Sequence, residues 1–497
     1  MLARHADSVT RRLFLLDRLH REVVLQTPGE SKHRWFRWLV VLGAGLLVWL
    51  IPAPASVSAA GWRLLAIFVA TVVGLIVQPL PMGAMAVLAI TVAAVTKTVS
   101  APVALSAFAN PVIWLIVAAF LFARAVIGTG LGRRIAYRFV HWFGSSTLRL
   151  GYALAGADFV VSPFIPSDTA RAGGIIFPIA RSLAEGYGSH PGPTARRLGA
   201  YLMQCAYHVG CTTAAVFLTS MAANPLAAEF AREFAGVEIT WGRWALASSV
   251  PAVVSLLVLP WLIYRLDRPE LEHTPHARQI ARRELAAMGA MTAGEKRLVF
   301  VLLAVIAGWV SQPWHGLHPA IVAYAGVSLL LLVGVMQWED VLNEHRAWDA
   351  FIWFGGLVMM ADGLNQMGVI RAFTDALERP LSGFGPMAAL VVLVLAYVYL
   401  HYGFASMTAH ITALYPAFLL LAVARGAPPL VSALALAFFS NLNASLTHYG
   451  TGPAPIFFGS GYVSLPTWWR VGFVVVLCNL VVWLGLGLLW WRLLELW

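Results

Sequence analysis

The chain has 497 residues, of which 60% are apolar and only 11% are charged. Soluble domains carry about 25% charged residues because their surface faces water, so this composition excludes an ordinary soluble domain. The net charge of +11 sits in short segments beside long apolar runs and is not interleaved with aromatic residues. That distribution favours a membrane protein and argues against a nucleic-acid partner.

The amino-terminal segment, residues 1–38, carries eight Lys or Arg against four Asp or Glu. It lacks the short apolar core of a cleavable signal. Apolar residues recur near helical spacing between Val9 and Leu25, with arginines between them. This pattern fits a helix on the cytoplasmic face, and a basic tail without regular structure is the alternative. We therefore assign 1–38 to a cytoplasmic basic segment.

Eleven apolar runs follow, of about the length that crosses a hydrocarbon core of about 30 Å as a helix. They lie near 39–55, 61–79, 84–99, 112–127, 198–220, 244–264, 298–312, 319–336, 350–368, 429–446 and 469–492. Two further apolar stretches, 150–186 and 386–425, are interrupted by Pro, Gly and small polar residues. Broken backbone at membrane depth is tolerated only where it is buried or lines a cavity. We therefore predict two re-entrant hairpins there, each entering and leaving on one side.

The distribution of arginines is consistent with this count of spans. If the amino terminus is cytoplasmic, four spans return the chain to the cytoplasm at residues 131–149, which hold four arginines. A hairpin and two more spans bring the charged loop 265–297 inside as well. Cytoplasmic loops are enriched in Lys and Arg, so the sequence predicts a multi-pass protein of a bacterial inner membrane.

The chain also repeats itself. The pair Ile113-Trp114 recurs as Ile352-Trp353, and Ser167 to Arg171 matches Ser406 to His410, each 239 residues further on. We divide the chain into a first transmembrane helix (39–60), a first repeat (61–264), the loop 265–297 and a second repeat (298–497). Each repeat has five spans and one hairpin, and an odd number of spans inverts the second copy. In such folds the substrate lies near the midplane, between the broken helices.

The two hairpin motifs carry the predicted chemistry. The hydroxyls of Ser167, Thr169, Ser406 and Thr408 can donate to carboxylate oxygens, as can the backbone N–H groups where a helix begins. The alternative is that small polar residues only allow close helix packing. Because the motif is duplicated beside broken backbone, we favour a binding site.

Two basic residues occupy equivalent positions, Arg171 in the first hairpin and His410 in the second. Ionisable residues inside a membrane are functional candidates because burying them in lipid is costly. Either could balance the charge of an anionic substrate without a metal ion. Alternatively, Arg171 pairs with Asp168, three residues earlier on the same helix face.

Three stretches resemble the signatures of the divalent anion:sodium symporter (DASS, or INDY-like) family. They are Pro163 to Pro178, His401 to Pro416 and Leu446 to Pro455. The closest resemblance is to the branch of 2-oxoglutarate/malate translocators and citrate/succinate or tartrate/succinate antiporters. It covers roughly residues 40–497. It implies a homodimeric elevator transporter whose two Ser-Asn-Thr motifs contact the substrate carboxylates.

Two residues depart from the family motif. Asp168 and Met407 stand where Asn is usual, so the predicted contacts are Ser167, Asp168, Thr169, Ser406, Met407 and Thr408. Met407 has no hard oxygen ligand, which argues against a sodium site in the second hairpin. An ionised Asp168 would repel a carboxylate unless Arg171 neutralises it, and a protonated one could donate to it. Backbone and hydroxyls near the broken helices complete the predicted site, at Gly210, Thr212, Thr447, Gly450 and Thr451.

The sequence thus predicts an all-α polytopic transporter of dicarboxylate or tricarboxylate anions, working by sodium-independent exchange without metal or cofactor. A sodium-coupled symporter of the same fold is the alternative. The chain has neither a Gly-x-Ser-x-Gly elbow nor a His-Glu-x-x-His zinc helix, so nothing points to an enzyme. Paired broken helices suit alternating access better than a passive channel.

Overall fold

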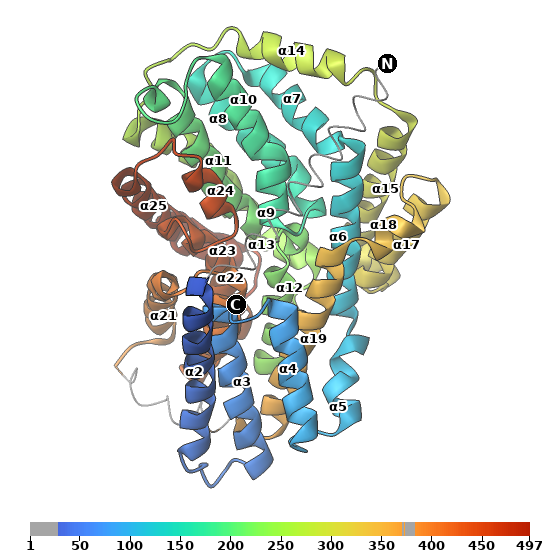
Figure 1. The fold of residues 1–497 in the computed structure, drawn as a ribbon, viewed down its shortest axis with the longest axis vertical. Coiled ribbons are helices and arrows are strands. Elements are labelled where there is room, and N and C mark those ends of the chain that lie inside the picture. The colour runs from blue at the N-terminus through green and yellow to red at the C-terminus, as the bar shows by residue number, and fades with distance from the viewer. Residues whose placement is uncertain (1–27, 370–371, 373–382) are drawn as a thin grey trace.

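The computed structural model describes residues 28–369, 372 and 383–497 (Figure 1). Most of the predicted cytoplasmic segment 1–38 therefore lies outside the described residues. Within them the chain is helical and no strand is assigned, as an all-α fold requires. Two groups of helices pack against one another.

The first group, which we call the framework, packs around α6 and α19. It runs along the lower and right-hand sides of Figure 1. Its helices are α2 (Pro28–Leu50), α3 (Ala59–Val77), α4 (Met82–Val95), α5 (Ala101–Ser106), α6 (Pro111–Thr129), α15 (Ala293–Val310), α17 (Pro319–Leu332), α18 (Trp338–Leu342) and α19 (His345–Gln366).

The second group, which we call the hairpin domain, packs around α11 and α23. Its helices are α8 (Thr147–Val161), α9 (Asp168–Arg171), α10 (Phe177–Gly186), α11 (Gly199–Val216), α13 (Trp241–Leu266), α21 (Pro386–Leu400), α22 (Met407–Ala424), α23 (Pro429–Leu442), α24 (Pro453–Gly459), α25 (Leu465–Leu480) and α26 (Leu488–Leu493). Both halves of the sequence thus contribute helices to both groups.

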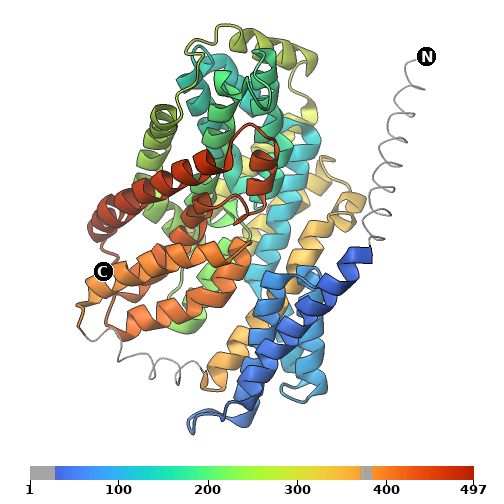
Figure 2. The same ribbon diagram turned by 60° about the vertical axis from the view of Figure 1, so that its left-hand side comes forward.

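Helix breaks occur inside both stretches for which hairpins are predicted. In hairpin 1, α8 ends at Val161, and Pro163 and Pro166 lie in the break because proline removes a backbone donor and disfavours helix in the preceding residue. The second arm, from α9 through a π-helical turn to α10, is continuous. In hairpin 2, α21 and α22 lie side by side (Figure 2), separated by the break at residues 401–406.

Seven helices in the described part of the chain are long and apolar enough to cross a membrane. They span Ala59–Val77, Pro111–Thr129, Trp241–Leu266, Pro386–Gly403, Met407–Ala424, Pro429–Leu446 and Leu465–Leu493. Both arms of hairpin 2 are among them, so length alone does not distinguish a re-entrant arm from a span. The re-entrant course of the two hairpins and the inverted repeat stay predictions.

Helical structure extends beyond the predicted spans. Residues 131–149, expected as a loop, contain α7 (Leu131–Phe143), which buries Leu131 and Val140 and exposes Arg133. The charged loop contains α14 (Ala277–Ala287), and α12 (Ala223–Ala235) lies where no element was expected. α7 and α14 are too polar to register as apolar runs, because each buries one face and exposes the other. α12 is buried along most of its length, but polar and charged residues such as Asn224 and Glu229 interrupt its apolar run.

Candidate functional site

The tip of hairpin 1 is organised by Ser167. This residue is the N-cap of α9, and its Oγ accepts a hydrogen bond from the backbone N–H of Ala170 at 3.1 Å. A capping serine satisfies one of the free N–H groups at a helix start and fixes where the helix begins. Its hydroxyl proton stays available for a partner. Ser167 is half-buried, as a residue on the wall of a cavity should be.

The residues after Ser167 contact a segment from the far end of the chain. The Oγ1 of Thr451 donates to Asp168 Oδ2 at 2.9 Å, and the backbone N–H of Thr169 donates to Asp168 Oδ1 at 2.7 Å. Gly452 lies so close that a Cβ there would come within 2.1 Å of Thr169 Oγ1. Hairpin 1 therefore contacts residues 451 and 452, which belong to the second predicted repeat.

Hairpin 2 repeats the capping arrangement. Ser406 is the N-cap of α22, and its Oγ accepts from the backbone N–H of Ala409 at 3.4 Å. Met407 follows and is buried, whereas Thr408 is half-buried. The backbone carbonyl of Thr408 accepts from the Thr412 hydroxyl at 2.8 Å. The hydroxyl of Ser406 thus has the same role as that of Ser167.

Hairpin 2 also contacts the segment Thr447–Gly452, which we call the bridging segment. The hydroxyl of Tyr449 donates to the carbonyl of Tyr402 at 2.9 Å. A Cβ on Gly450 would come within 2.5 Å of His401 Nε2. Consecutive Cα atoms are 3.8 Å apart, so residues 449 and 452 are separated by at most about 11 Å. The two hairpin tips therefore converge on the same short segment, in the middle of the molecule in Figure 1.

Arg171 is buried and ion-paired, but with Asp158 and not with Asp168. Its Nε lies 2.8 Å from Asp158 Oδ1, and its Nη1 donates to the carbonyls of Ile165 and Ser220 at 3.1 and 2.9 Å. The alternative pairing with Asp168 is thus not what the structure shows. Because Asp158 already neutralises the guanidinium, a direct role for Arg171 in balancing substrate charge stays a prediction that these contacts do not favour.

His410, at the equivalent position, is buried in an aromatic and polar environment. Its Nε2 lies 3.1 Å from the carbonyl of Tyr397, and its Nδ1 lies 3.3 Å from Nδ2 of Asn443. A carbonyl requires a donor and an amide NH₂ requires an acceptor, so this arrangement describes a neutral imidazole. Turning the Asn443 amide over would present its oxygen instead, which suits a charged ring. The role of His410 in charge balance stays a prediction.

The remaining predicted residues lie around the helix breaks. The carbonyl of Gly210 accepts from Thr213 Oγ1 at 3.0 Å and from Arg171 Nη2 at 3.5 Å, so it belongs to the Arg171 cluster. Thr212 donates to its own helix at the carbonyl of His208. The Thr447 hydroxyl is buried without a hydrogen-bond partner among the described residues.

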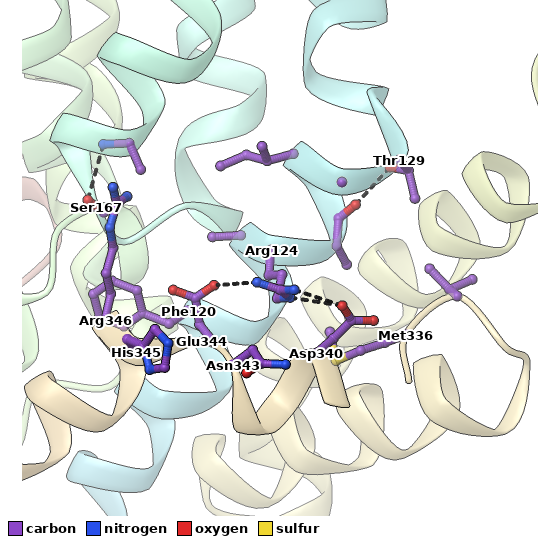
Figure 3. Close-up of a pocket in the computed structure, with 16 residues that line it drawn as sticks. Phe120, Arg124, Thr129, Ser167, Met336, Asp340, Asn343, Glu344, His345 and Arg346 are labelled. Carbon is purple, nitrogen blue, oxygen red and sulfur yellow. Dashed lines mark hydrogen bonds and ion pairs between the residues drawn. The ribbon is translucent and has the colours of Figure 1, made fainter. Parts of the chain in front are cut away.

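A cavity of about 660 Å³ opens between the hairpin domain and the framework (Figure 3). Ser167 lines its hairpin side, and α6, α18 and the start of α19 line the other. Arg124 on α6 lies 2.8 Å from Asp340 Oδ1 and 3.6 Å from Glu344 Oε2. The backbone N–H of Gln337 and then Arg124 lower the pKa of Asp340, which keeps that carboxylate ionised.

Sequence reasoning missed Asp158, Tyr397 and the charged residues of this cavity. Asp158 was visible as an acid inside an apolar stretch, which is itself a signal. Tyr397 stands 239 residues beyond Asp158, and each lies 13 residues before its basic partner. Asp340, Glu344 and Arg346 lay in a short segment between two predicted spans and had no local pattern, whereas Arg124 was an ionisable residue inside the predicted span 112–127. In the described part of the chain, no cluster of three or more His, Cys, Asp or Glu residues could hold a metal ion.

Comparison with known proteins adds the family. A family model described as the sodium:sulfate symporter transmembrane region matches residues 32–497. The chain is 48% identical to the putative malate transporter YflS of Bacillus subtilis, over 92% of this chain and 96% of that protein. It is 45% identical to dicarboxylate transporter 1 of Spinacia oleracea chloroplasts, over 91% of this chain and 80% of that protein. Inner membrane protein YbhI of Escherichia coli is 35% identical over 94% of this chain and 99% of its own length.

Two solved structures share the fold at low sequence identity. The YdaH transporter of Alcanivorax borkumensis has a TM-score of 0.53 at 14% identity, covering 78% of this chain and 86% of that one. MtrF of Neisseria gonorrhoeae has a TM-score of 0.55 at 12% identity, covering 92% and 94%. The all-α polytopic fold is thereby confirmed. The match over nearly the whole chain shows that the protein belongs to the sodium:sulfate symporter family of membrane transporters, as its resemblance to DASS proteins predicted.

Proposed function

We propose that the chain is a secondary active transporter that exchanges small dicarboxylate or tricarboxylate anions across a bacterial inner membrane. The names of the relatives support this substrate class, since one is a putative malate transporter and another a dicarboxylate transporter. The cargo is a substrate that crosses the membrane unchanged, and no catalytic group is needed.

The convergence of the two hairpins carries this proposal. Ser167 and Ser406 each cap a second hairpin arm, and the residues beside them meet on the bridging segment. Two capped helix starts provide hydroxyls and backbone N–H groups, which are the donors that carboxylates accept. Pairing such sites suits an anion with a carboxylate at each end.

The arrangement of the two groups supports an elevator mechanism. The cavity that reaches Ser167 lies between the hairpin domain and the framework, so a movement of one against the other would open and close access to it. We propose that the hairpin domain carries the substrate and that the framework forms the contact between two copies in a homodimer. The amino terminus is cytoplasmic in this proposal, which places residues 337–349 on the cytoplasmic side.

Sodium coupling is the second candidate, and one observation favours it. Asn443 Oδ1, Ser445 Oγ and Thr447 Oγ1 are buried beside hairpin 2 without hydrogen-bond partners among the described residues. Buried polar atoms nearly always have a partner, so water or a cation would satisfy them. Against a cation stands Met407, whose thioether is a poor ligand for a hard ion. We therefore place exchange first.

Reconstituted vesicles test the exchange mechanism. Purified protein in liposomes should take up labelled succinate or malate only when the vesicles contain an unlabelled dicarboxylate. Uptake that proceeds equally well into empty vesicles would show net transport and contradict exchange. Liposomes without protein are the control for leakage.

A further inference from the structure

The cavity in Figure 3 contains two arginines with different electrostatic environments. Arg124 is held by Asp340 and Glu344, so its charge is already compensated. Arg346 has no hydrogen bond or ion pair with any residue that the structure describes, and its side chain extends across the cavity toward Ser167 in Figure 3. The two arginines and the two carboxylates of the cavity balance in formal charge, but both carboxylates pair with Arg124, so Arg346 forms no ion pair with the described residues beside the tip of hairpin 1.

The position of Arg346 in its helix strengthens this observation. It lies in the first turn of α19, a helix of 22 residues whose N-cap, Glu344, makes no side-chain capping bond. The start of a helix carries partial positive charge, so a cation there is electrostatically unfavourable and an acidic residue is preferred. The carboxylate of Glu344 stands at this helix start, but it lies 3.6 Å from Arg124 and forms no ion pair with Arg346. The guanidinium of Arg346 is exposed in the cavity and stays open to an incoming anion.

The cavity also has the size and the lining of a small-molecule site. Its volume of about 660 Å³ lies within the usual range for such sites. Ser167 belongs to hairpin 1, whereas Arg346 belongs to the framework. An anion at Ser167 therefore meets a guanidinium that does not belong to the domain carrying it.

We propose that Arg346 binds a carboxylate of the substrate in this cavity, and that it strengthens binding from this side of the membrane only. This inference rests on the proposed dicarboxylate transport. When the hairpin domain moves, Ser167 leaves Arg346 behind on the framework. The site facing the other side lacks this contact, so the transporter has a higher affinity for substrate on the side of the cavity. In the proposed topology that side is the cytoplasm.

Oriented membrane vesicles test this asymmetry. The Michaelis constant for succinate is measured in everted vesicles, which expose the cytoplasmic face, and in right-side-out vesicles. Arg346→Gln should raise it about tenfold in everted vesicles, because a charged hydrogen bond contributes roughly one factor of ten, and leave it unchanged in right-side-out ones. Arg346→Lys keeps the charge and should lose only a small part of the affinity.

Arg282→Gln is the matched control. Arg282 is exposed on α14, outside the cavity, and the substitution removes the same charge from the same side. Added salt should narrow the gap between wild type and Arg346→Gln, because exposed charges are screened. If Arg346→Gln behaves like Arg282→Gln, or weakens binding equally from both sides, the inference is wrong although the transport function stands. If the wild-type protein exchanges no dicarboxylate, both proposals are overturned.

Discussion

The two hairpins share a backbone plan but differ in how they accommodate a basic residue. In both, a serine caps the second arm, and a basic residue four positions later contacts a partner 13 residues before it. In hairpin 1 the partner is the carboxylate of Asp158, and in hairpin 2 it is the backbone carbonyl of Tyr397. Hairpin 1 thus holds an ion pair, and hairpin 2 holds a neutral ring.

This difference shows that equivalent sequence positions need not have equivalent charge. Arg171 cannot lose its proton in a protein, so burying it requires a carboxylate. A histidine can remain neutral and needs only hydrogen bonds. In their present contacts neither residue presents a free charge to a substrate, which is why Arg346, unpaired among the described residues, matters in the cavity.

The largest expected effect comes from breaking the ion pair of hairpin 1. Asp158→Asn leaves the buried Arg171 without a counter-charge, and such a loss costs about 3–5 kcal/mol. Thermal unfolding of the detergent-solubilised variant should show a large drop in stability. Adding Arg171→Gln should restore part of it, because the unpaired charge is then gone. If Asp158→Asn alone were as stable as wild type, the ion pair between Asp158 and Arg171 would not be what stabilises hairpin 1.

Two glycine substitutions in the bridging segment test whether both hairpins depend on it, and the expected effect is the second largest. Gly452→Ala places a Cβ against Thr169 of hairpin 1, and Gly450→Ala places one against His401 of hairpin 2. Overpacking costs about 1–3 kcal/mol of folding stability, so each variant should unfold at a lower temperature than wild type, and its transport rate should fall because the hairpin is displaced. Gly459→Ala is the control, since nothing lies within 4 Å of the added atom. Full activity in either variant would show that the hairpin it contacts does not depend on the bridging segment.

A smaller effect is expected when the hydrogen bond between the hydroxyls of Tyr397 and Ser440, beside hairpin 2, is removed. Tyr397→Phe removes the hydrogen bond between the Tyr397 and Ser440 hydroxyls, which is 2.8 Å long, but keeps the carbonyl that binds His410. The loss of folding stability should be about 1 kcal/mol, well below the loss expected for Asp158→Asn. Unfolding of the two variants under identical conditions gives the comparison. Equal losses would contradict the view that only hairpin 1 depends on a charge.

The smallest effect concerns Asp168, where hairpin 1 departs from the family motif. Asp168→Asn replaces a carboxyl group beside the proposed substrate site by an amide of nearly the same shape. The Thr451 hydroxyl can reverse and accept from the new amide, so the contact with the bridging segment should survive. Affinity for succinate at neutral pH should rise about threefold, in line with removal of a partly screened repulsion. Unchanged or weaker binding would withdraw Asp168 from the site.

Most of the apolar helices of both groups could be predicted from the sequence, because apolar runs of membrane length have few other structures available to them. The helices α7 and α14 could not, since one buried face gives a weaker signal than a continuous apolar run. α12 could not either, because polar and charged residues interrupt its apolar sequence although most of the helix is buried. The motifs also located the helix breaks, for Pro acts locally. They singled out Ser167 and Ser406 as substrate contacts, whereas the role of these serines as N-caps comes from the structure. The partner of Arg171 was not predictable from spacing along one helix, because Asp158 comes from the other arm of the hairpin. Likewise, only the fold brings Arg346 opposite Ser167.

Sodium dependence tests the central claim most directly. Two hairpins that bury an ion pair and a neutral imidazole at corresponding positions, with Met407 at the second motif, should bind and exchange dicarboxylates without a metal ion. In vesicles loaded with succinate, the rate of labelled succinate exchange should be the same whether the medium contains sodium or choline. An exchange rate that collapses in choline and recovers on addition of sodium would contradict the claim. It would assign the buried oxygens of Asn443, Ser445 and Thr447 to a cation instead.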